Sequence, residues 1–373
     1  MFNTHAYENL FATFAFILGA VVGSFLNVCI YRMPLGLSVN EPRRSFCPKC
    51  KYQIPWYRNL PLFSWLALRG KCANCKCAIP FRYFGVELLT AALFLAVWLE
   101  CWGSGRWLQV LPYWILTSLL IVATFIDFEH FIIPDEITWG GMVAGIVLSF
   151  AIPPLMSVEK PWEALLWSAV GAASGYFLLW GVVEMGKIAF GKKTVLLDTA
   201  EEFSWKREGD EAELKVGDET MKWSEIFSRE SDQLIMKCTR AEIAGKHYAN
   251  IILHFHYNRL MVSGTEHKLE TLEAISGNVF EITVPREAMG FGDVKFIAAI
   301  GAFLGWKAVL FTVAAGSVAG AVVGGTTMLI GKKHWSSKIP FGPYLALGAF
   351  AWLFAGSEII RWYLNLVTPA SGL

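Results

Sequence analysis

Long stretches without charge dominate the hydrophobic pattern of this chain. A helix that crosses a membrane needs about 20 predominantly apolar residues, and five runs of 20 residues or more contain no Asp, Glu, Lys or Arg. A sixth run has 19 residues, and two further apolar segments carry a few charges near their ends. In chain order the eight segments are 10–30, 83–102, 107–126, 137–158, 164–183, 289–306, 308–331 and 339–357. We therefore predict an all-α polytopic membrane protein with about eight transmembrane helices.

One region departs from this pattern. Between 192 and 286 about a third of the residues are charged, and short alternating stretches such as 251–257 lie between turns rich in Gly and Asp. Such alternation is typical of a half-buried strand, so we predict a small β-rich insert. His254 and His256 suggest a metal site, but they alternate with apolar residues and lack further ligands at a recognisable spacing. We favour the polar face of a strand for this pair.

Composition agrees with a membrane protein and excludes several other classes. Charged residues make up 17% of the chain, against about 25% in average proteins. Sixteen Trp and 27 Phe exceed what a soluble core of this size would hide, which argues against a soluble globular enzyme. Eight cysteines are too few for a disulfide-dense secreted module. A net charge of +1 argues against nucleic acid as a partner.

The basic residues predict an orientation, because Lys and Arg collect in loops on the cytoplasmic side of a membrane. The loop 31–82 holds ten of them and is expected in the cytoplasm. With eight alternating spans, the same side receives the turn 127–136, the region 187–286 and the three lysines of 332–338. Both termini would then face outward.

The basic loop also contains a cysteine motif. Two C-x-x-C pairs, Cys47 with Cys50 and Cys72 with Cys75, are separated by 21 residues. Paired knuckles at this spacing are typical of a structural zinc site, in which four thiolates form a tetrahedron. The alternatives are two disulfides or a reduced, empty loop, and a reducing cytoplasm disfavours the disulfides. Cys77 lies two residues beyond the motif and could compete as a ligand.

Two carboxylic acids stand out because an ionisable residue at membrane depth is by default a functional candidate. Asp127 follows the charge-free run 107–126, and Asp293 lies in a G-x-G-D motif at the start of the segment 289–306. On the predicted topology both acids lie at the same membrane face. Two carboxylates brought together share a proton, and such a pair can activate water and protonate a leaving amine. Taken singly, Asp127 could be an interfacial anchor and Asp293 a helix N-terminal acid.

These motifs resemble those of the bifunctional prepilin leader peptidase and N-methyltransferase family. The segment 23–34 is similar to the family's first helix and its exit. Asp127 with 133–135, and the segment 290–295, are similar to its two aspartyl motifs. The cysteine-containing cytoplasmic domain of the family is matched by the segments 44–50, 59–72 and 81–87. The resemblance covers both flanks of the insert and most of the chain.

The resemblance implies a multi-pass enzyme of the bacterial inner (cytoplasmic) membrane, with its active site facing the cytoplasm. Such an enzyme removes the short basic leader of type IV prepilins or pseudopilins and then methylates the new N-terminal residue. Asp127 and Asp293 would be its catalytic pair. The four cysteines of the two C-x-x-C pairs would form the zinc-binding cluster of a domain associated with methyl transfer, for which the family uses S-adenosylmethionine. No sequence pattern names the residues that bind this methyl donor.

The insert is the main departure from the family, which reaches its G-x-G-D motif after a much shorter loop. It could dock components of a pilus or type II secretion assembly, or it could gate access to the two acids. It could also be a tolerated insertion, since long surface loops add little closure entropy. We therefore expect four parts: 1–106 with the first two helices and the cysteine region, 107–191 as the first half of the peptidase, 192–286 as the insert, and 287–373 as the second half.

Two other functions fit some of these features. An ion-coupled membrane transporter could bind a cation with Asp127 and Asp293, but transporter sites usually lie near the bilayer midplane, and both acids lie at segment ends. A membrane-anchored zinc module without catalysis leaves the G-x-G-D acid unexplained. If the protein is a peptidase, Asp135 is the alternative to Asp127 as a catalytic acid.

Overall fold

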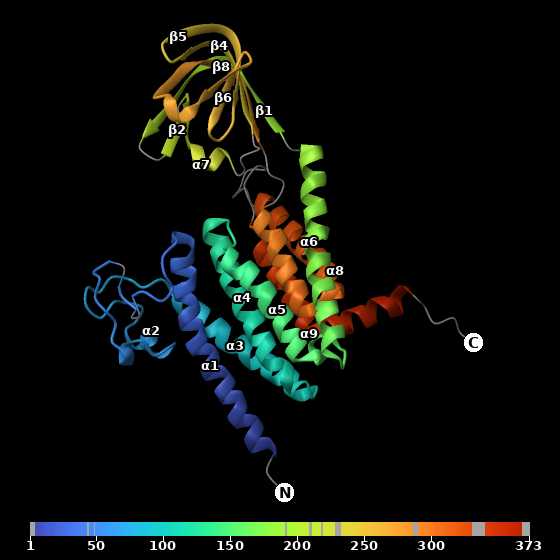
Figure 1. Cartoon of the computed structure of the whole chain (residues 1–373). Coiled ribbons are helices and arrows are strands. Elements are labelled where there is room, and N and C mark those ends of the chain that lie inside the picture. Colours follow the sequence, from blue (N-terminus) through green and yellow to red (C-terminus); the bar gives the residue numbers. More distant parts are fainter. Residues whose placement is uncertain are drawn as a thin grey trace. The chain divides into compact units, whose positions relative to one another are not determined.

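The computed structural model describes residues 4–42, 45–47, 49–190, 192–208, 211–217, 219–227, 233–285, 290–329 and 340–367 (Figure 1). Contacts within the chain divide it into two units. The helical unit comprises Met1–Trp180 and Gly290–Leu373, and the β unit comprises Gly181–Met289. The lysines of 332–338, along with Arg43, Arg44 and Arg286, lie outside the described residues.

Long apolar helices build the helical unit (Figure 1). They are α1 (Thr4–Arg32), α3 (Phe81–Gly103), α4 (Val110–His130), α5 (Asp135–Ala151), α6 (Pro161–Phe190), α8 (Phe291–Leu329) and α9 (Gly342–Val367), with the short α2 (Phe63–Ala67) in the cysteine region. Helix α1 packs along α3, and α8 packs against both α5 and α9. Many of their large apolar side chains are exposed, which is expected where lipid rather than water surrounds a helix.

Among the described residues, five helices are long and apolar enough to cross a membrane, so the protein is a multi-pass membrane protein. They are Glu8–Leu35, Phe81–Gly103, Trp107–His130, Pro161–Gly186 and Phe291–Thr327. The predicted number of eight is not confirmed. The segment 137–158 yields only the 17 residues of α5, because Pro153 and Pro154 follow it and proline cannot continue a helix. The apolar part of α9, Gly342–Gly356, is also short.

Helix α8 contains two of the segments that the sequence separates. Gly305 has φ 79° and ψ 172°, a conformation outside the helical region. A Cβ built on Gly301 would lie 2.8 Å from Cγ2 of Val309, whereas residues eight positions apart along a straight helix are about 12 Å apart. The chain therefore bends back sharply at Gly305. The two halves of α8 correspond to the predicted segments 289–306 and 308–331.

The first half of α8 is held by unusually close helix contacts. A Cβ on Gly171 of α6 would lie 2.2 Å from the carbonyl oxygen of Gly301, and one on Gly145 of α5 would lie 2.8 Å from Cβ of Ala302. Ser168 donates a hydrogen bond of 2.7 Å to the carbonyl oxygen of Ala302. Small residues let helix backbones approach closely inside a membrane. These contacts fix the helix that carries Asp293 against α5 and α6.

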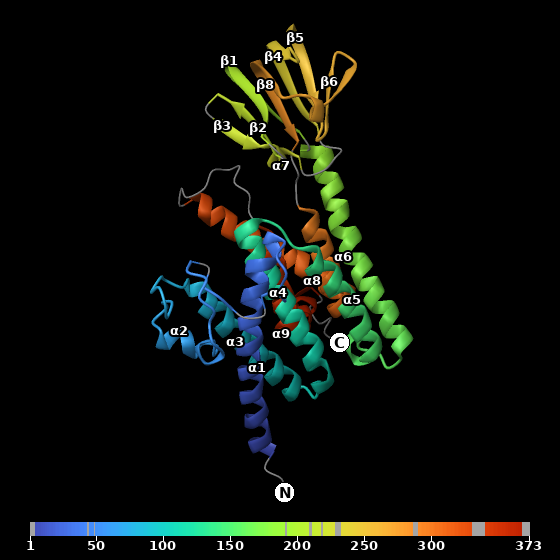
Figure 2. The same ribbon diagram turned by 60° about the vertical axis from the view of Figure 1, so that its left-hand side comes forward.

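In the part of the β unit that the structure describes, eight strands form one antiparallel sheet (Figure 2). Its order is β3-β2-β1-β8-β4-β5-β6-β7. The strands are β1 (Lys192–Glu208), β2 (Glu211–Val216), β3 (Glu219–Lys222), β4 (Leu234–Ile243), β5 (Lys246–Phe255), β6 (Arg259–Val262), β7 (Thr265–Lys268) and β8 (Ala274–Pro285), with the short α7 (Trp223–Ile226) after β3. The β-rich insert is confirmed. Because this sheet is a substantial part of the chain, the predicted all-α class is not confirmed.

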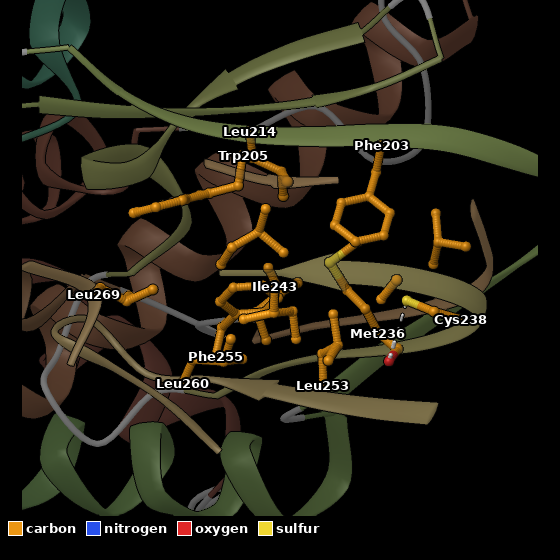
Figure 3. Close-up of a cluster of buried hydrophobic side chains, with 14 of the residues drawn as sticks. Phe203, Trp205, Leu214, Met236, Cys238, Ile243, Leu253, Phe255, Leu260 and Leu269 are labelled. Atoms are coloured by element: carbon orange, nitrogen blue, oxygen red, sulfur yellow. Dashed lines mark hydrogen bonds between the residues drawn. The ribbon is translucent and has the colours of Figure 1, made fainter. Parts of the chain in front are cut away.

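A separate hydrophobic core stabilises the β unit (Figure 3). Trp205, Leu253 and Phe255 are at most 1% exposed within it. Along β5 the buried residues alternate with Ile252, which is 44% exposed, and with half-buried His254. His254 lies on the face of β5 opposite the buried residues, as we favoured, and His256 follows the end of the strand.

The alternation of buried and exposed residues along β5 leads to a prediction about stability. We expect Leu253→Ala to destabilise the β unit by about 2–5 kcal/mol, the range for removing a buried leucine side chain. Pulse proteolysis of the full chain in detergent over a urea series measures this. Ile252→Ala is the matched control on the opposite face, and its effect should stay below about 1 kcal/mol. Equal destabilisation by the two variants would contradict the face assignment.

Candidate active site and metal centre

Asp127 lies in the last turn of α4 and is 5% exposed. The helix ends at Phe131, whose φ of 56° lets its N–H donate to the carbonyl oxygen of Asp127. Pro134 then precedes α5. The Asp127 Oδ2 atom accepts a hydrogen bond of 2.9 Å from the backbone N–H of Gly342, at the start of α9. A residue 215 positions away thus fixes the orientation of this carboxylate.

Asp293 lies in the first turn of α8 and is 8% exposed. Its N–H donates to the carbonyl oxygen of Gly290 at 3.2 Å, which closes the turn of the G-x-G-D motif. Its Oδ1 atom is buried and finds no hydrogen-bond partner among the described residues. A buried carboxyl oxygen without a partner is unfavourable, and is the kind of feature that functional sites retain.

The structure brings the two acids close together around Ile133. A Cβ on Gly292 would lie 3.3 Å from Cβ of Ile133, and one on Gly342 would lie 3.0 Å from Cδ1 of the same residue and 2.8 Å from Oδ2 of Asp127. Gly292, the residue before Asp293, and Gly342, whose N–H donates to Asp127, thus both lie against Ile133. Gly292 in the G-x-G-D turn and Gly342 at the start of α9 therefore leave room for Ile133, which lies in the loop after α4.

Asp135 has a different environment. It is 64% exposed, and its Oδ1 atom accepts a hydrogen bond of 2.6 Å from Nζ of Lys295. This ion pair joins the first turn of α5 to the first turn of α8. The geometry therefore gives Asp135 the role of a tether between helices, while Asp127 and Asp293 are buried.

The cysteine region consists of two similar knuckles. In the first, the Cys47 N–H donates to the carbonyl oxygen of Tyr52, and in the second the Cys72 N–H donates to that of Cys77. Each knuckle turns through a lysine with positive φ, 59° at Lys51 and 58° at Lys76. Isolated bridges between Phe46 and Gln53, and between Lys71 and Ala78, close the two turns.

The four predicted ligand sulfurs all lie within 4.8 Å of one another. Cys47 Sγ is 3.9 Å from Cys75 Sγ, and Cys50 Sγ is 4.0 Å from Cys72 Sγ. These values are near the roughly 3.8 Å between sulfurs of a zinc tetrathiolate with Zn–S bonds of about 2.3 Å. Cys77 Sγ lies 3.2 Å from Cys75 Sγ and 3.6 Å from Cys47 Sγ. Cys77, which could compete as a ligand, therefore belongs to the same cluster of sulfurs.

Backbone N–H groups make this cluster receptive to a cation. Those of Cys50, Tyr52 and Cys75 lower the pKa of the Cys47, Cys50 and Cys72 thiols respectively. A thiolate is the form that binds metal. Four thiolates in a closed set, with no other ligand type, suit a structural zinc ion rather than a catalytic one. The residues present therefore fit zinc.

Several of these partners were not identified from the sequence. Gly342 reaches Asp127 only through the fold, although the Gly-Pro pair at 342–343 before an apolar run marks a helix start. The packing of Ile133 against Gly292 and Gly342 likewise depends on the fold. Lys295 was visible as a charge in an apolar segment, which is a functional signal in itself. Arg82 of α3 forms an ion pair with Glu129 of α4, linking the cysteine region to the helix of Asp127.

Fold and site together define a multi-pass membrane protein that carries a pair of buried carboxylic acids, as an aspartic peptidase of the membrane would. Two family models match the chain. The bacterial peptidase A24 N-terminal domain matches residues 17–101, and the type IV leader peptidase family matches residues 114–194 and 251–325. The chain belongs to the type IV leader peptidase family.

Relatives carry one common name. A prepilin leader peptidase/N-methyltransferase of Aeromonas hydrophila is 27% identical over 391 residues, covering 97% of this chain and 96% of the relative. The protein of that name in Myxococcus xanthus is 40% identical over 201 residues, 53% of this chain and 57% of the relative. The one in Pseudomonas aeruginosa is 27% identical and covers 94% of this chain and 92% of the relative. No solved structure matches the chain. These names do not favour the ion-coupled transporter.

Proposed function

We propose that this protein cleaves the leader peptide of type IV prepilins or pseudopilins and methylates the new N-terminal residue, with Asp127 and Asp293 as the catalytic pair. The observation that carries the proposal is the meeting of two buried acids at the ends of two apolar helices. The names of the relatives supply the substrate class.

The pair supplies both groups that peptide hydrolysis needs. The charged carboxylate takes a proton from the water that attacks the peptide carbonyl, while the protonated partner gives its proton to the leaving nitrogen. The Gly342 N–H stabilises charge on Oδ2 of Asp127. Electrostatic repulsion between neighbouring carboxylates disfavours two charges. The Gly342 N–H favours the charged form of Asp127, so Asp293, whose buried Oδ1 finds no partner among the described residues, is the proton donor.

We further propose that both acids face the cytoplasm of a bacterial cell, at the surface of its inner membrane. Asp127 lies in the last turn of α4 and Asp293 in the first turn of α8. Both acids are therefore at helix ends, which suits cleavage of a leader peptide at the membrane surface. The ten basic residues of the loop 31–82 support the same side. The reversal at Gly305 supports counting α8 as two passes, and with α5 and α9 included the eight passes remain our proposal.

The other groups are assigned by region. We propose that zinc occupies the cysteine cluster and holds its fold, and that S-adenosylmethionine donates the methyl group. The peptidase would comprise 107–191 and 287–373, with the cysteine region of 1–106 serving methyl transfer. The insert 192–286, within which the family match breaks off, is the part we propose for contacts with pilus or type II secretion assembly components.

Mass spectrometry of a prepilin co-expressed with this chain tests the proposal. We expect a product that lacks the leader and carries one added methyl group, whereas the prepilin expressed alone should stay intact. An intact prepilin in cells where the chain is folded in the membrane would contradict the peptidase assignment. A cleaved but unmethylated product would contradict the methyltransferase assignment alone.

The contact between Gly342 and Asp127 gives a sharper prediction. We expect Gly342→Ala to lower leader cleavage about 10- to 100-fold, because the new Cβ would displace the Asp127 carboxylate and small misplacements of catalytic groups are costly. The rate of cleavage of a purified prepilin measures it. Gly140→Ala is the matched control, since no atom lies within 4 Å of its Cβ position. Equal rates for the two variants would remove Gly342 from the site.

A further inference from the structure

A cavity of about 840 Å³ lies between the end of α1, the cysteine region and the start of α3. The last turn of α4 completes its wall with Glu129 and His130. All of these elements belong to the helical unit. The volume falls within the roughly 300–1,000 Å³ of small-molecule sites. Cys47, Cys72 and Cys77 of the cysteine cluster form part of its wall, but a zinc ion held between the sulfurs would fill only a small part of this volume.

One wall residue requires a hydrogen-bond donor. Asn27 of α1 is 3% exposed and lines the cavity. Its Nδ2 atom donates to the carbonyl oxygen of Tyr83 at 2.9 Å, which fixes the side chain. Its Oδ1 atom is buried and has no partner among the residues described. A buried amide oxygen without a donor is unfavourable by about 1–3 kcal/mol, so this atom is positioned for an N–H or O–H group of a ligand.

The cavity carries charges of both signs beside aromatic rings, with the basic residues Arg32, Lys49, Arg58 and Arg82 outnumbering Glu87 and Glu129. Glu87 is a half-buried acid whose Oε2 atom accepts the Leu62 N–H at 2.7 Å. Arg82, paired with Glu129, leaves its buried Nε atom without a partner in the described part of the chain. Trp65 offers an indole ring whose N–H is already bonded to the backbone. Such walls suit a ligand with positive and negative groups and a flat ring system.

The cavity is also placed where the peptidase product forms. Glu129 and His130 follow Asp127 by two and three residues on α4, which is about 3–4.5 Å along the helix axis. Cleavage at the acid pair creates a new amino terminus beside this helix end. A group that reacts with that amine would have to be held close to it, since proximity is the main requirement of group transfer.

We propose that this cavity binds S-adenosylmethionine, with Asn27 as a direct hydrogen-bonding residue, an inference that rests on the proposed function. The amine nitrogen of the cleaved pilin forms a bond to the methyl carbon, and the carbon–sulfur bond breaks. Its electron pair stays on sulfur, which turns the sulfonium into a neutral thioether, and the proton of the methylated amine passes to water. The Glu87 carboxylate would attract the positive sulfonium and amino groups, the basic side chains of the wall would attract the carboxylate of the ligand, and the aromatic walls would take the adenine ring.

Binding to the purified full chain in detergent tests this without any turnover. We expect Asn27→Leu, which keeps the size of the side chain and removes its oxygen, to weaken binding of radiolabelled S-adenosylmethionine at least about tenfold. Asn9→Leu is the matched control, because Asn9 lies on the same helix and is exposed far from the cavity. Equal affinities for both variants would overturn the inference, as would an absence of binding by the unchanged chain.

A second measurement keeps the test valid if Asn27→Leu does not fold. Ultraviolet cross-linking of the labelled donor to the unchanged chain should place the label on Trp65 or Tyr83, whose side chains line the cavity. A label in the β unit or on α8 would contradict the inference. Failure here differs from failure of the proposed function, because a chain that cleaves and methylates a prepilin while binding the donor elsewhere leaves the peptidase and methyltransferase assignments intact.

Discussion

Replacing Asp127 or Asp293 by Asn is expected to reduce leader cleavage at least about 100-fold, because each substitution removes one member of a proton-sharing pair and general acid–base groups contribute about 10²–10⁴-fold to rate. Asparagine keeps the size of the side chain, so we expect both variants to fold and insert. Cleavage of a purified prepilin, followed by mass spectrometry, measures the loss. Recovery of each variant from the membrane at the normal level shows that folding is not the cause.

Asp135→Asn is the matched control for this prediction. Asp135 is 64% exposed and held by Lys295 rather than buried, so its loss should loosen the link between α5 and α8 and lower cleavage less than about tenfold. A larger loss of cleavage in Asp135→Asn than in Asp127→Asn would contradict the assignment. If Asp127→Asn cleaves a prepilin near the normal rate and Asp135→Asn does not, the acid pair has been assigned wrongly.

Loss of zinc from the cysteine cluster is the second large effect that we expect. The unchanged protein should contain about one zinc per chain, as a closed tetrathiolate site does. The double change Cys47→Ser with Cys72→Ser removes one sulfur from each knuckle and should abolish metal content, which plasma mass spectrometry of purified protein measures. Cys101 and Cys238 are buried free cysteines outside the cluster, and replacing both by Ser is the control. Full zinc content in the Cys47/Cys72 variant would place the metal elsewhere.

The same variant tests how methylation and cleavage are divided. We expect methylated product to fall more than cleaved product, since the acid pair lies on α4 and α8 and the cysteines lie between α1 and α3. Damage could pass from one region to the other through the packing of α1 and α3 against α4 and through the ion pair between Arg82 and Glu129. Equal loss of both products would make the cysteine region a support for the whole active face rather than a methylation module.

Local features of the sequence predicted much of this site. The four cysteines and the two acids are each marked by residue type against an apolar or basic background, so no long-range information was needed to select them. The structure brings the cysteines together and buries both acids. What could not be predicted is the contact between Asp127 and Gly342, because a backbone N–H carries no side-chain signal and its partner lies 215 residues away.

The differences between the predicted and the observed helices also have physical causes. The count of eight spans treated every apolar run as a full helix, yet two prolines after Ile152 shorten α5. A single glycine at 305 lets two runs join as one bent element. Alternation revealed strands near 251–257, but the pairing of β1 with β8 joins residues far apart in sequence. Strand order of that kind depends on packing rather than on local pattern.

The neighbouring positions of β1 and β8 in the sheet have a consequence for how such a chain arises and changes. Lys192 and Pro285, near the two ends of the insert, are partners across this strand pair, and partners in an antiparallel sheet lie about 5 Å apart. The β unit therefore leaves the helical chain and returns to it at nearly one point. A hairpin of a few residues spans the same gap, so a single genetic insertion or deletion can add or remove the whole sheet without lengthening the path between α6 and α8.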